Sequence, residues 1–589
     1  MNLTNNIVLL ETLRRDKDNS RNFLFANPVE VITCRKPSDL QKCFRQMEDR
    51  REKGFFLAGF FAYELGYFLE ESLSEYCPKH DYPLLWFGVY PEPLRRLPQD
   101  DQHENRPFFF SQPRLAIDFG QYEKAIRKIK TCIAEGETYQ INYTSGYDFH
   151  FIGDVAGFYE RLKQSQKVSY SAIIRFDGHV VISLSPELFF RVDARGNIIV
   201  KPMKGTSPLS ASSRWLSHDE KNKSENVMIV DLLRNDLGRI CLPGSVKVKK
   251  LFEVEKYETL LQMTSTVTGK LRPQIKMYDM VKSLFPCGSV TGAPKIRSMK
   301  IISDLEQGPR NIYTGAIGYF APDGRAVFNV AIRTIDLCRQ SGNQYGARMG
   351  VGGGIVYDSR PKDEFEECGL KGAFLRETMP EFALIETMLL ENGMIKYLGR
   401  HLQRLKKSAR YFSIACPVDQ IKTALEAYAA KQSGRIRLRL LLKPDGGFLI
   451  RHQPAASRPA SSLLVAVSRH KTDSTDPFLY HKTTHRKLYN EELKKYSARG
   501  YFDVVFQNEK NEITEGAISN IFIQSKGKWY TPPLSCGLLN GIARQVMIRK
   551  LHAREKILYL KDLKSADQIV LTNSVRGANP VILKSERKK

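Results

Sequence analysis

Apolar and polar residues follow two different periods in the first half of the chain. Residues 224–239 carry apolar side chains at helical spacing, which predicts a helix with Glu225 near its start and a polar end. Residues 180–192 alternate between apolar and polar positions, which predicts a strand. Residues 200–208 are typical of a further strand that runs into a glycine turn, so the pattern places Lys204 on a strand beside that turn.

The strand lysine and the helix acid are candidates for chemistry. A desolvated lysine loses its proton and becomes a nucleophile, and an acid that faces inward is a candidate metal ligand. A turn over residues 193–197 joins the strand of Glu187 to the strand of Lys204, and pairing would bring both side chains to one face. Because most lysines and helix acids are solvated, the structural alternative for each is an exposed side chain.

Further polar groups gather in the segments that follow. Residues 285–295 form a glycine-rich turn before a predicted helix, and the exposed N–H groups of such a turn suit carboxylates. Arg348 can grip a carboxylate through two parallel hydrogen bonds. Glu364 and Glu367 lie three positions apart on a predicted helix, which puts both acids on one face.

Two long motifs connect these residues to a known family. Residues 202–206 (Pro-Met-Lys-Gly-Thr) and the segment that begins Glu-Asn-Val-Met-Ile-Val-Asp at residue 225 resemble the chorismate-using enzymes. That family includes anthranilate synthase and the isochorismate and salicylate synthases, and the likeness is greatest to component I of aminodeoxychorismate synthase. The resemblance is nearly continuous over residues 116–376 and weak over residues 1–115.

The resemblance implies roles for the candidate residues. Lys204 would be the nucleophile and Glu187 the acid that faces it across the substrate, with Lys201 contributing mainly its charge. A Mg²⁺ ion would be held by Glu225 and Glu367, with Glu364 in support. The implied substrate contacts are Thr291, Tyr313, Arg333, Arg348, Gly352 and Gly354. This chain departs from many relatives at Gln262, where they carry a histidine, so the role of that histidine does not carry over.

The pattern changes after residue 381. Residues 382–390 predict a strand, the Asn392-Gly393 pair is a strong hairpin signal, and residues 401–409 predict a helix. This order resembles the class IV aminotransferase-type family, which uses pyridoxal 5′-phosphate (PLP), and within it aminodeoxychorismate lyase. Lys482 matches the lysine that binds PLP covalently. Glu515 would pair with the pyridine nitrogen and keep the ring electron-withdrawing.

Other residues of the second half match the phosphate-binding positions of that family. Arg404 matches the phosphate-binding arginine, and two turns look suited to cradle a phosphate group. The residues of these turns are Gly541, Ile542, Asn573 and Ser574.

Composition narrows the setting of the protein. The chain has 589 residues, 42% hydrophobic and 26% charged, which indicates a soluble protein of several domains. Ten cysteines without Cys-x-x-Cys spacing, and no apolar run of membrane-spanning length, favour a reduced cytoplasmic protein with no membrane segment. The net charge of +26 is spread along the chain without a nucleic-acid-binding motif, so no nucleic-acid partner is predicted.

Together these patterns predict an α+β protein of two catalytic halves. The first would be a two-sheet sandwich with helices, comprising an N-terminal region (1–115) and a chorismate-binding domain (116–376). After a linker (377–381), residues 382–589 would form a fold-type IV PLP domain of two α/β subdomains. The resemblance implies 4-aminobenzoate synthesis for folate: chorismate and ammonia would give 4-amino-4-deoxychorismate, and loss of pyruvate would follow.

Some features of this hypothesis stay open. No glutaminase nucleophile motif is visible, so ammonia would come from a glutamine amidotransferase subunit or from solution. A homodimer through the PLP domain is also compatible with the family. The alternatives are a D-amino-acid or branched-chain transaminase for the second half, and an anthranilate synthase for the first. Anthranilate synthases carry a small residue where Lys204 stands, which disfavours the latter.

Overall fold

A computed structural model describes residues 6–14, 22–94, 108–208, 219–256, 260–378, 382–455 and 463–584. The chain divides into two compact units. The first comprises Met1–Glu104, Gln112–Phe151 and Ala156–Thr378, and the second comprises Asn105–Ser111, Ile152–Val155 and Met379–Lys589. Residues 379–381 of the predicted linker lie outside the described residues. No helix in the described ranges is long and apolar enough to span a membrane.

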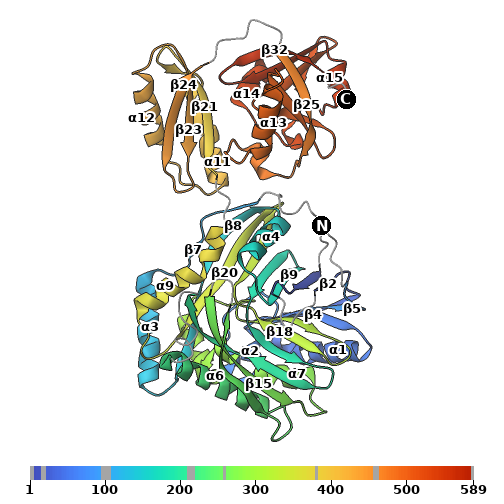
Figure 1. The fold of residues 1–589 in the computed structure, drawn as a ribbon, viewed down its shortest axis with the longest axis vertical. Helices are drawn as coiled ribbons and strands as arrows, with labels where there is room; N and C mark the ends of the chain where they lie inside the picture. Colours follow the sequence, from blue (N-terminus) through green and yellow to red (C-terminus); the bar gives the residue numbers. More distant parts are fainter. Residues whose placement is uncertain are drawn as a thin grey trace. The chain divides into compact units, whose positions relative to one another are not determined.

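Two antiparallel sheets form the first unit (Figure 1). In order across the first sheet, the strands are β16 (Gly292–Ala293), β8 (Gln140–Gly153), β20 (Gln344–Ile355), β19 (Thr334–Ser341), β10 (His179–Ser185), β9 (Tyr170–Phe176), β1 (Ile7–Glu11) and β2 (Phe23–Phe25), with β7 (Arg114–Leu115) beside β8. The second sheet runs β13 (Met203–Pro208), β15 (Leu260–Lys270), β12 (Asn197–Lys201), β11 (Leu188–Val192), β18 (Ala326–Val330), β17 (Ala316–Phe320), β4 (Phe56–Phe61), β5 (Leu85–Tyr90) and β3 (Glu30–Cys34), with β14 (Lys247–Lys256) beside β15. Since β1 to β5 belong to these sheets, the predicted regions 1–115 and 116–376 share one core.

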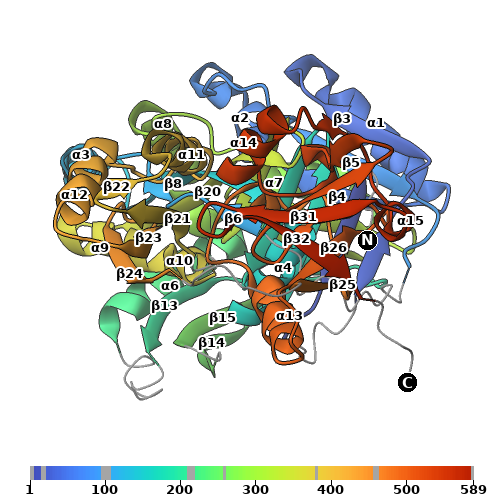
Figure 2. The same cartoon turned by 90° about the horizontal axis from the view of Figure 1, so that it is seen from above.

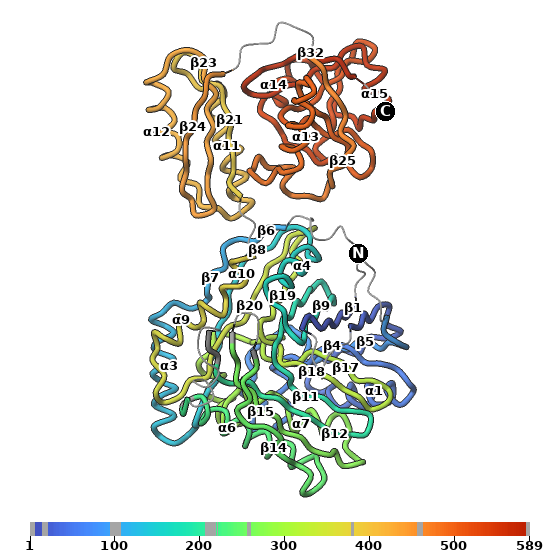
Figure 3. The backbone as a smooth tube through the Cα atoms, in the orientation of Figure 1, coloured from blue at the N-terminus to red at the C-terminus, as the bar shows by residue number. Residues whose placement is uncertain are grey.

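Helices cover the sheets of the first unit. They are α1 (Leu40–Glu52), α2 (Leu65–Leu69), α3 (Phe119–Ala134), α4 (Val155–Ser165), α6 (Glu220–Gly238), α7 (Met277–Leu284), α8 (Lys295–Leu305), α9 (Pro361–Lys371) and α10 (Ala373–Glu377). Helices α3 and α9 lie side by side although they are far apart in sequence (Figures 1 and 3). Helix α1 packs on β3 and β4 (Figure 2).

The strand β4 shows why the sandwich holds together. Its alternate residues enter two different cores: Phe60 packs against residues of both sheets, including Ile174, while Phe61 packs with α1 and α7. A strand buried on both faces must be apolar throughout, as residues 56–61 are. The predicted two-sheet sandwich with helices is therefore confirmed.

The second unit has two sheets with separate cores. A four-stranded antiparallel sheet, counted over the described residues, contains β22 (Met394–Ile395), β21 (Leu384–Glu391), β23 (Arg435–Leu442) and β24 (Phe448–Pro454), on which α11 (Leu398–Tyr411) and α12 (Val418–Ala429) pack (Figure 3). The Asn392-Gly393 turn between β21 and β22 has positive φ at both residues, as the hairpin signal predicted.

The other sheet of this unit is mixed. It runs β27 (Ile513–Gly516), β26 (Asp503–Asn508), β25 (Leu463–Thr472), β32 (Gly577–Leu583), β31 (Gln568–Asn573), β28 (Asn520–Ser525), β29 (Lys528–Thr531) and β30 (Arg554–Glu555). Its helices are α13 (Lys487–Ser497), α14 (Ile542–Lys550) and α15 (Leu560–Lys564), and the short strand β6 (Phe108–Phe110) also belongs to this unit. The two predicted subdomains are both present.

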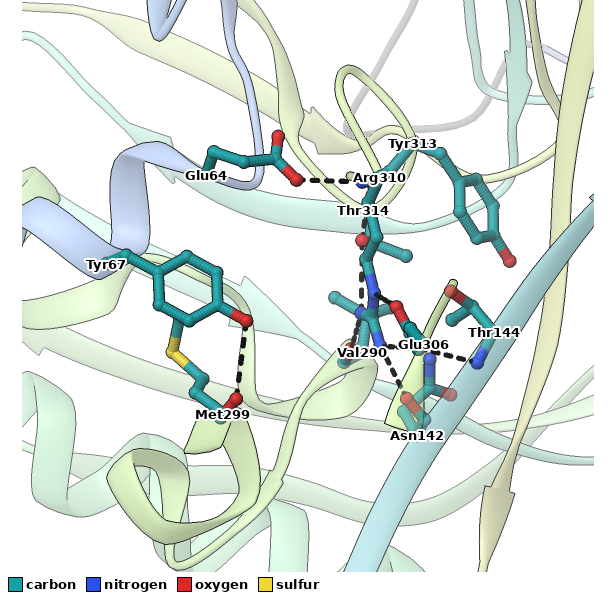
Figure 4. A network of polar contacts seen from close by, with 10 residues as sticks. All are labelled: Glu64, Tyr67, Asn142, Thr144, Val290, Met299, Glu306, Arg310, Tyr313 and Thr314. Carbon is teal, nitrogen blue, oxygen red and sulfur yellow. Dashed lines mark hydrogen bonds and ion pairs between the residues drawn. The ribbon is translucent and has the colours of Figure 1, made fainter. Parts of the chain in front are cut away.

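A buried arginine joins four segments of the first unit (Figure 4). The Arg310 guanidinium donates to both carboxylate oxygens of Glu306, at 2.7 and 2.8 Å, and to the carbonyls of Asn142 and Val290, at 2.6 and 2.8 Å. Its backbone N–H donates to the Glu64 carboxylate at 2.7 Å. These bonds hold β8 and the turn after Val290 against α8 and α2, and both segments contribute to the candidate site.

The Glu306→Gln variant tests this network. Gln keeps the shape of the side chain but leaves the Arg310 charge buried without a counter-ion, which typically costs about 3–5 kcal/mol. We expect that loss in the free energy of unfolding of the first unit, measured by urea denaturation with the fluorescence of buried Trp86. Glu220→Gln is the control, since Glu220 forms its ion pair with Lys223 at the surface and is 88% exposed. A loss below 1 kcal/mol for Glu306→Gln would contradict the structural role.

Candidate functional site

Glu187 is buried, and two serines hold it, one at its backbone and one at its carboxylate. Glu187 directly precedes β11, and its N–H donates to the Ser185 hydroxyl at 3.1 Å, while that hydroxyl donates to the carbonyl of Val330 at 2.6 Å. Its Oε1 atom accepts a hydrogen bond from the Ser289 hydroxyl at 2.7 Å. Burial raises the pKa of Glu187 to about 7, although the Ser289 hydrogen bond and the charge of Lys204 oppose the rise. The carboxyl can therefore hold or release a proton near neutral pH.

Lys204 lies on β13 and faces the same space. Burial lowers the pKa of Lys204, while the carboxylates of Glu225, Glu187 and Glu367 work in the opposite direction. The positive charge of Lys371 adds to the lowering. The structure thus brings the predicted nucleophile and the predicted acid together, as expected from their neighbouring strands.

The expectation that Lys201 supplies the neighbouring charge is wrong. Lys201 pairs with Glu255 at 2.5 Å, and Lys371 is the cation that acts on Lys204. The reason is geometric: residues three positions apart in extended chain project to opposite faces. The Lys371 ammonium donates to the carbonyl of Gly352 at 2.6 Å and pairs with Glu367 at 2.7 Å.

The glycines of β20 make room for Lys204. A methyl group on Gly354 would lie 2.0 Å from the Gln140 amide nitrogen and 3.1 Å from the Lys204 ammonium. On Gly352, a methyl group would lie 2.4 Å from the carbonyl oxygen of Tyr143 on the adjacent strand β8. A side chain at Gly354 would fill the space in front of the lysine, and one at Gly352 would push against β8.

Gln140 is a site residue that the sequence did not single out. It is 1% exposed, and neither amide atom of its side chain has a hydrogen-bond partner among the described residues. An unpaired buried amide is costly, so a bound substrate or water is its natural partner. Its signal in the sequence was weak, because one amide at the start of an apolar strand has many structural explanations.

The three predicted metal ligands lie around Lys204 and Lys371. Glu225 and Glu367 both act on Lys204, and Glu367 pairs with Lys371. Glu364 accepts a hydrogen bond from the Ser359 hydroxyl at 2.7 Å, and a methyl group on Gly353 would lie 3.2 Å from its other oxygen and 3.7 Å from the Lys371 ammonium. No group of three or more His, Cys, Asp or Glu in the described ranges is placed to hold a metal ion by itself. Two carboxylates still fit Mg²⁺, which takes oxygen ligands and usually keeps water or substrate oxygens in its remaining positions.

The predicted substrate contacts are not all in one place. Thr291 is buried next to β8, since its carbonyl accepts the N–H of Asn142 at 2.7 Å. Arg348 is six residues from Gly354 along β20, about 20 Å at 3.3 Å per residue. Its side chain is 49% exposed and pairs with Asp148 at 3.4 Å, so the structure does not bring it to Lys204.

Two further predicted substrate contacts, Tyr313 and Arg333, have other side chains or glycines as their neighbours. The Tyr313 ring packs against Gly350, where a methyl group would come within 2.0 Å of the ring. Tyr313 also lines a small pocket with Arg348. The Arg333 guanidinium donates to the side chain of Gln166 at 2.6 Å.

A second site lies in the second unit, in a pocket of about 360 Å³. All seven residues predicted for the cofactor line this pocket: Arg404, Lys482, Glu515, Gly541, Ile542, Asn573 and Ser574.

Lys482 and Glu515 have strongly shifted pKa values in this pocket. Burial lowers the pKa of Lys482 to about 7, and the charges of Arg486 and Arg404 add to the effect. Burial raises the pKa of Glu515 to about 8, and Asn520 donates to its carboxylate at 3.0 Å. An amine that is neutral near pH 7 is suited to covalent catalysis.

Arg404 is held from behind by an acid that the sequence analysis missed. Its guanidinium donates to both oxygens of Glu386, at 2.9 and 2.6 Å, and His401 bonds the same carboxylate at 2.6 Å. Burial alone would raise the pKa of Glu386, but the charge of Arg404 and the hydrogen bonds from His401 and Arg404 together lower it to about 2. An acid inside an apolar strand was the available signal.

The turns near Gly541 and Asn573 fit a phosphate group. Gly541 immediately precedes α14, and a methyl group on it would lie 2.1 Å from the side-chain oxygen of Asn520. The side-chain oxygen of Asn573 accepts the N–H groups of Val575 and Arg576, at 3.1 and 2.8 Å, which shapes the second turn. With Lys482 and Glu515 in the same pocket, these residues fit PLP.

The shifted pKa of Lys482 can be measured directly. In PLP-free protein, competitive acetylation followed by peptide mass spectrometry should give Lys482 a midpoint near pH 7, against about 10.4 for an ordinary lysine. Lys487, whose side chain is 88% exposed, is the internal reference. A midpoint for Lys482 near that of Lys487 would show that burial does not control this amine.

Three similar proteins place the first half of the chain. It is 42% identical over 258 residues to an aminodeoxychorismate synthase of Streptomyces pristinaespiralis, covering 43% of this chain and 35% of that protein. It is 37% identical over 260 residues to anthranilate synthase component 1 of Saccharolobus solfataricus, covering 43% and 60%. The crystal structure of anthranilate synthase component I from Streptococcus pneumoniae TIGR4 is similar with a TM-score of 0.52 at 25% identity, covering 61% of this chain and 93% of that one.

Two family matches divide the chain as the fold does. Residues 383–583 match the amino-transferase class IV family, a kind of domain that implies PLP as cofactor. Residues 10–377, more than half of the chain, match the chorismate binding enzyme family. The chain therefore belongs to the chorismate binding enzyme family and carries a class IV aminotransferase domain after it.

Proposed function

We propose that the first unit converts chorismate and ammonia to 4-amino-4-deoxychorismate. The observation that carries the proposal is Lys204, a half-buried lysine with a lowered pKa that faces the protonatable carboxyl of Glu187. Relatives of both kinds, aminodeoxychorismate and anthranilate synthases, are similar to this chain, so overall identity does not decide between them. The lysine favours the former, because anthranilate synthases carry a small residue there.

The proposed chemistry uses these two side chains in turn. The neutral amine of Lys204 bonds to C2 of chorismate, the ring double bonds shift, and the C4 hydroxyl leaves as water with a proton from Glu187. Ammonia then attacks C4, the double bonds shift back, and the bond to Lys204 breaks. A proton returns from the new nitrogen to Glu187, so the net change is replacement of hydroxyl by amine with release of water.

The remaining residues of the site would hold the substrate. Glu225 and Glu367 would bind Mg²⁺, which would anchor the ring carboxylate, and Glu364 would support them from the same helix as Glu367. Gly352 and Gly354 would leave space for the ring, and Thr291 would lie at its edge. The unpaired amide of Gln140 is free to bond a substrate oxygen.

We further propose that the second unit removes pyruvate from 4-amino-4-deoxychorismate to give 4-aminobenzoate. Bound PLP would supply an electron sink for the elimination. Lys482 would hold the cofactor and then move a proton, and Glu515 would bond the ring nitrogen. Arg404, backed by Glu386, would bind the phosphate together with the two turns.

The setting of the reaction follows from the same proposal. Ammonia would come from a glutamine amidotransferase subunit, in a cytoplasmic assembly in which the PLP domains can pair as a homodimer. The chain spans between about a third and three-fifths of the length of the curated relatives described above, so its activity, substrates and partners all stand as proposals.

The whole proposal is tested by product analysis. Purified protein with chorismate, ammonium, Mg²⁺ and PLP should yield 4-aminobenzoate and pyruvate, identified by mass spectrometry. Lys482→Ala should stop at 4-amino-4-deoxychorismate, because only the second step uses that lysine, while the exposed-site control Lys487→Ala should behave like wild type. Anthranilate as product, or no product, would overturn the assignment.

The covalent role of Lys204 has its own test. Wild-type protein incubated with chorismate without ammonia should carry a chorismate-derived adduct on the peptide that contains Lys204. Lys201→Ala is the matched control and should keep the adduct, since Lys201 is engaged with Glu255. Lys204→Ala should lose it. An adduct on Lys201, or full synthase activity in Lys204→Ala, would remove Lys204 from this role.

A further inference from the structure

The pocket of the second unit contains more positive charge than its cofactor uses. Besides Arg404, four arginines line it: Arg437, Arg439, Arg486 and Arg576. The charge of Arg404 is already balanced by its two hydrogen bonds to Glu386. Lys482 and Glu515 are one cationic and one acidic group, so they offset each other.

Two of these arginines project from one strand into the pocket. Arg437 and Arg439 are alternate residues of β23, so they share a face of the sheet, while Leu438 between them is buried in the core on the other face. Arg439 lies directly across from Thr387 of β21, which also lines the pocket. The strand therefore aims both guanidinium groups at the same space.

None of the four arginines has an acidic partner within ion-pair distance among the described residues. Arg486 donates to the neutral side chain of Asn490 at 3.1 Å and to the carbonyl of Ala517, and Arg576 lies over the Phe502 ring at 5.0 Å. The Nε atom of Arg439 is buried with no hydrogen-bond partner in the part of the chain that the structure describes. A buried guanidinium without an acidic partner is typical of a site that binds an anion.

The electrostatics support this reading. The pKa of Arg437 is lowered by burial and by the charges of Arg439 and Arg576, and that of Arg439 is lowered by burial and by Arg486 and Arg451. Arginine stays protonated even so. The protein thus keeps like charges together in a partly buried pocket, which is unfavourable until anions bind.

The number of arginine charges indicates which anions the pocket binds. A phosphate monoester carries between about −1.5 and −2 near pH 7, which accounts for about two of the four unpaired arginines. The two that are left over match two carboxylates on the substrate.

We infer that the second pocket is built for a primary amine that carries two carboxylates, with Arg437 and Arg439 as the residues that hold them. The inference rests on the proposed function in one respect, since 4-amino-4-deoxychorismate is such an amine. Glutamate is another, so the test includes both.

The test measures binding through the absorbance of PLP in the loaded full-length protein, which reports on this pocket and not on the first unit. The diacid probe is 3-[(1-carboxyvinyl)oxy]benzoate, and the matched monoacid is 3-isopropenyloxybenzoate, in which a methyl group replaces the second carboxylate. The variants are Arg437→Gln and Arg439→Gln. The control is Arg451→Gln, an exposed arginine across from Arg439 on β24 that does not line the pocket.

Wild type and Arg451→Gln should bind the diacid about 10- to 100-fold more tightly than the monoacid, the range expected for a charged hydrogen-bonded pair. Each pocket variant should weaken the diacid about 10-fold or more. The variant at the arginine that holds the carboxylate missing from the monoacid should change the monoacid less than 3-fold, whereas the other variant should weaken both probes by a similar factor. Arg437→Lys keeps the charge but cannot form two parallel hydrogen bonds, so its affinity for the diacid should lie between those of wild type and Arg437→Gln. It replaces Arg437→Gln if the Gln variant does not load PLP. A diacid preference that survives in both pocket variants, or is missing in wild type, overturns the inference.

Turnover separates this inference from the proposed function. With 4-amino-4-deoxychorismate as substrate, the pocket variants should raise KM by a similar factor and change kcat much less. If D- or L-glutamate is consumed instead and no pyruvate is released from 4-amino-4-deoxychorismate, the dicarboxylate pocket stands and the lyase assignment fails. If pyruvate release proceeds with unchanged KM in both variants, the lyase stands and the arginine assignment fails.

Discussion

Removing charged groups from water is the physical constraint on which both halves of this protein depend. Arg310 and Glu386 are buried with full compensation, each held by an opposite charge and several hydrogen bonds. They remain charged and act as structural anchors. Lys204 and Lys482 are half-buried with less compensation, so their pKa values fall and their amines become available for bonding. Removal from water is common to all four groups, and the partners decide which of them is reactive.

In the first site, burial and the neighbouring acids have opposite effects on the pKa of Lys204. Glu225 and Glu367 favour the protonated form of Lys204, in opposition to burial and to Lys371. If those two carboxylates bind a divalent cation, its charge offsets theirs. They then stabilise the Lys204 ammonium less, and the amine loses its proton more readily. Metal ligands and nucleophile would then form one electrostatic unit. In such a unit the lysine becomes a nucleophile only once the site is loaded.

Sequence reasoning found the residues that local patterns place, and it missed those placed by distant contacts. Glu187 and Lys204 follow from neighbouring strands, and the Asn392-Gly393 hairpin follows from turn chemistry. Lys371 acquires its role from the Gly352 carbonyl on β20, and Glu386 acquires its role from His401 and Arg404 on α11, contacts that no local pattern records. The contribution of Lys201 was misjudged because it lies three positions from Lys204 in extended chain, so its side chain projects to the opposite face and pairs with Glu255.

The two halves solve a shared recognition problem with different residues. In the proposed first reaction, amination changes only the C4 substituent of chorismate, so the substrate and the product would carry the same two carboxylates. Arginines that hold those carboxylates in the second pocket cannot distinguish the two molecules. The distinction must come from the amine, which only the product can offer to the covalent chemistry at Lys482. On these proposals affinity in the second site would come from Arg437 and Arg439 and selectivity from Lys482, so unused chorismate would occupy the second pocket as an unreactive competitor.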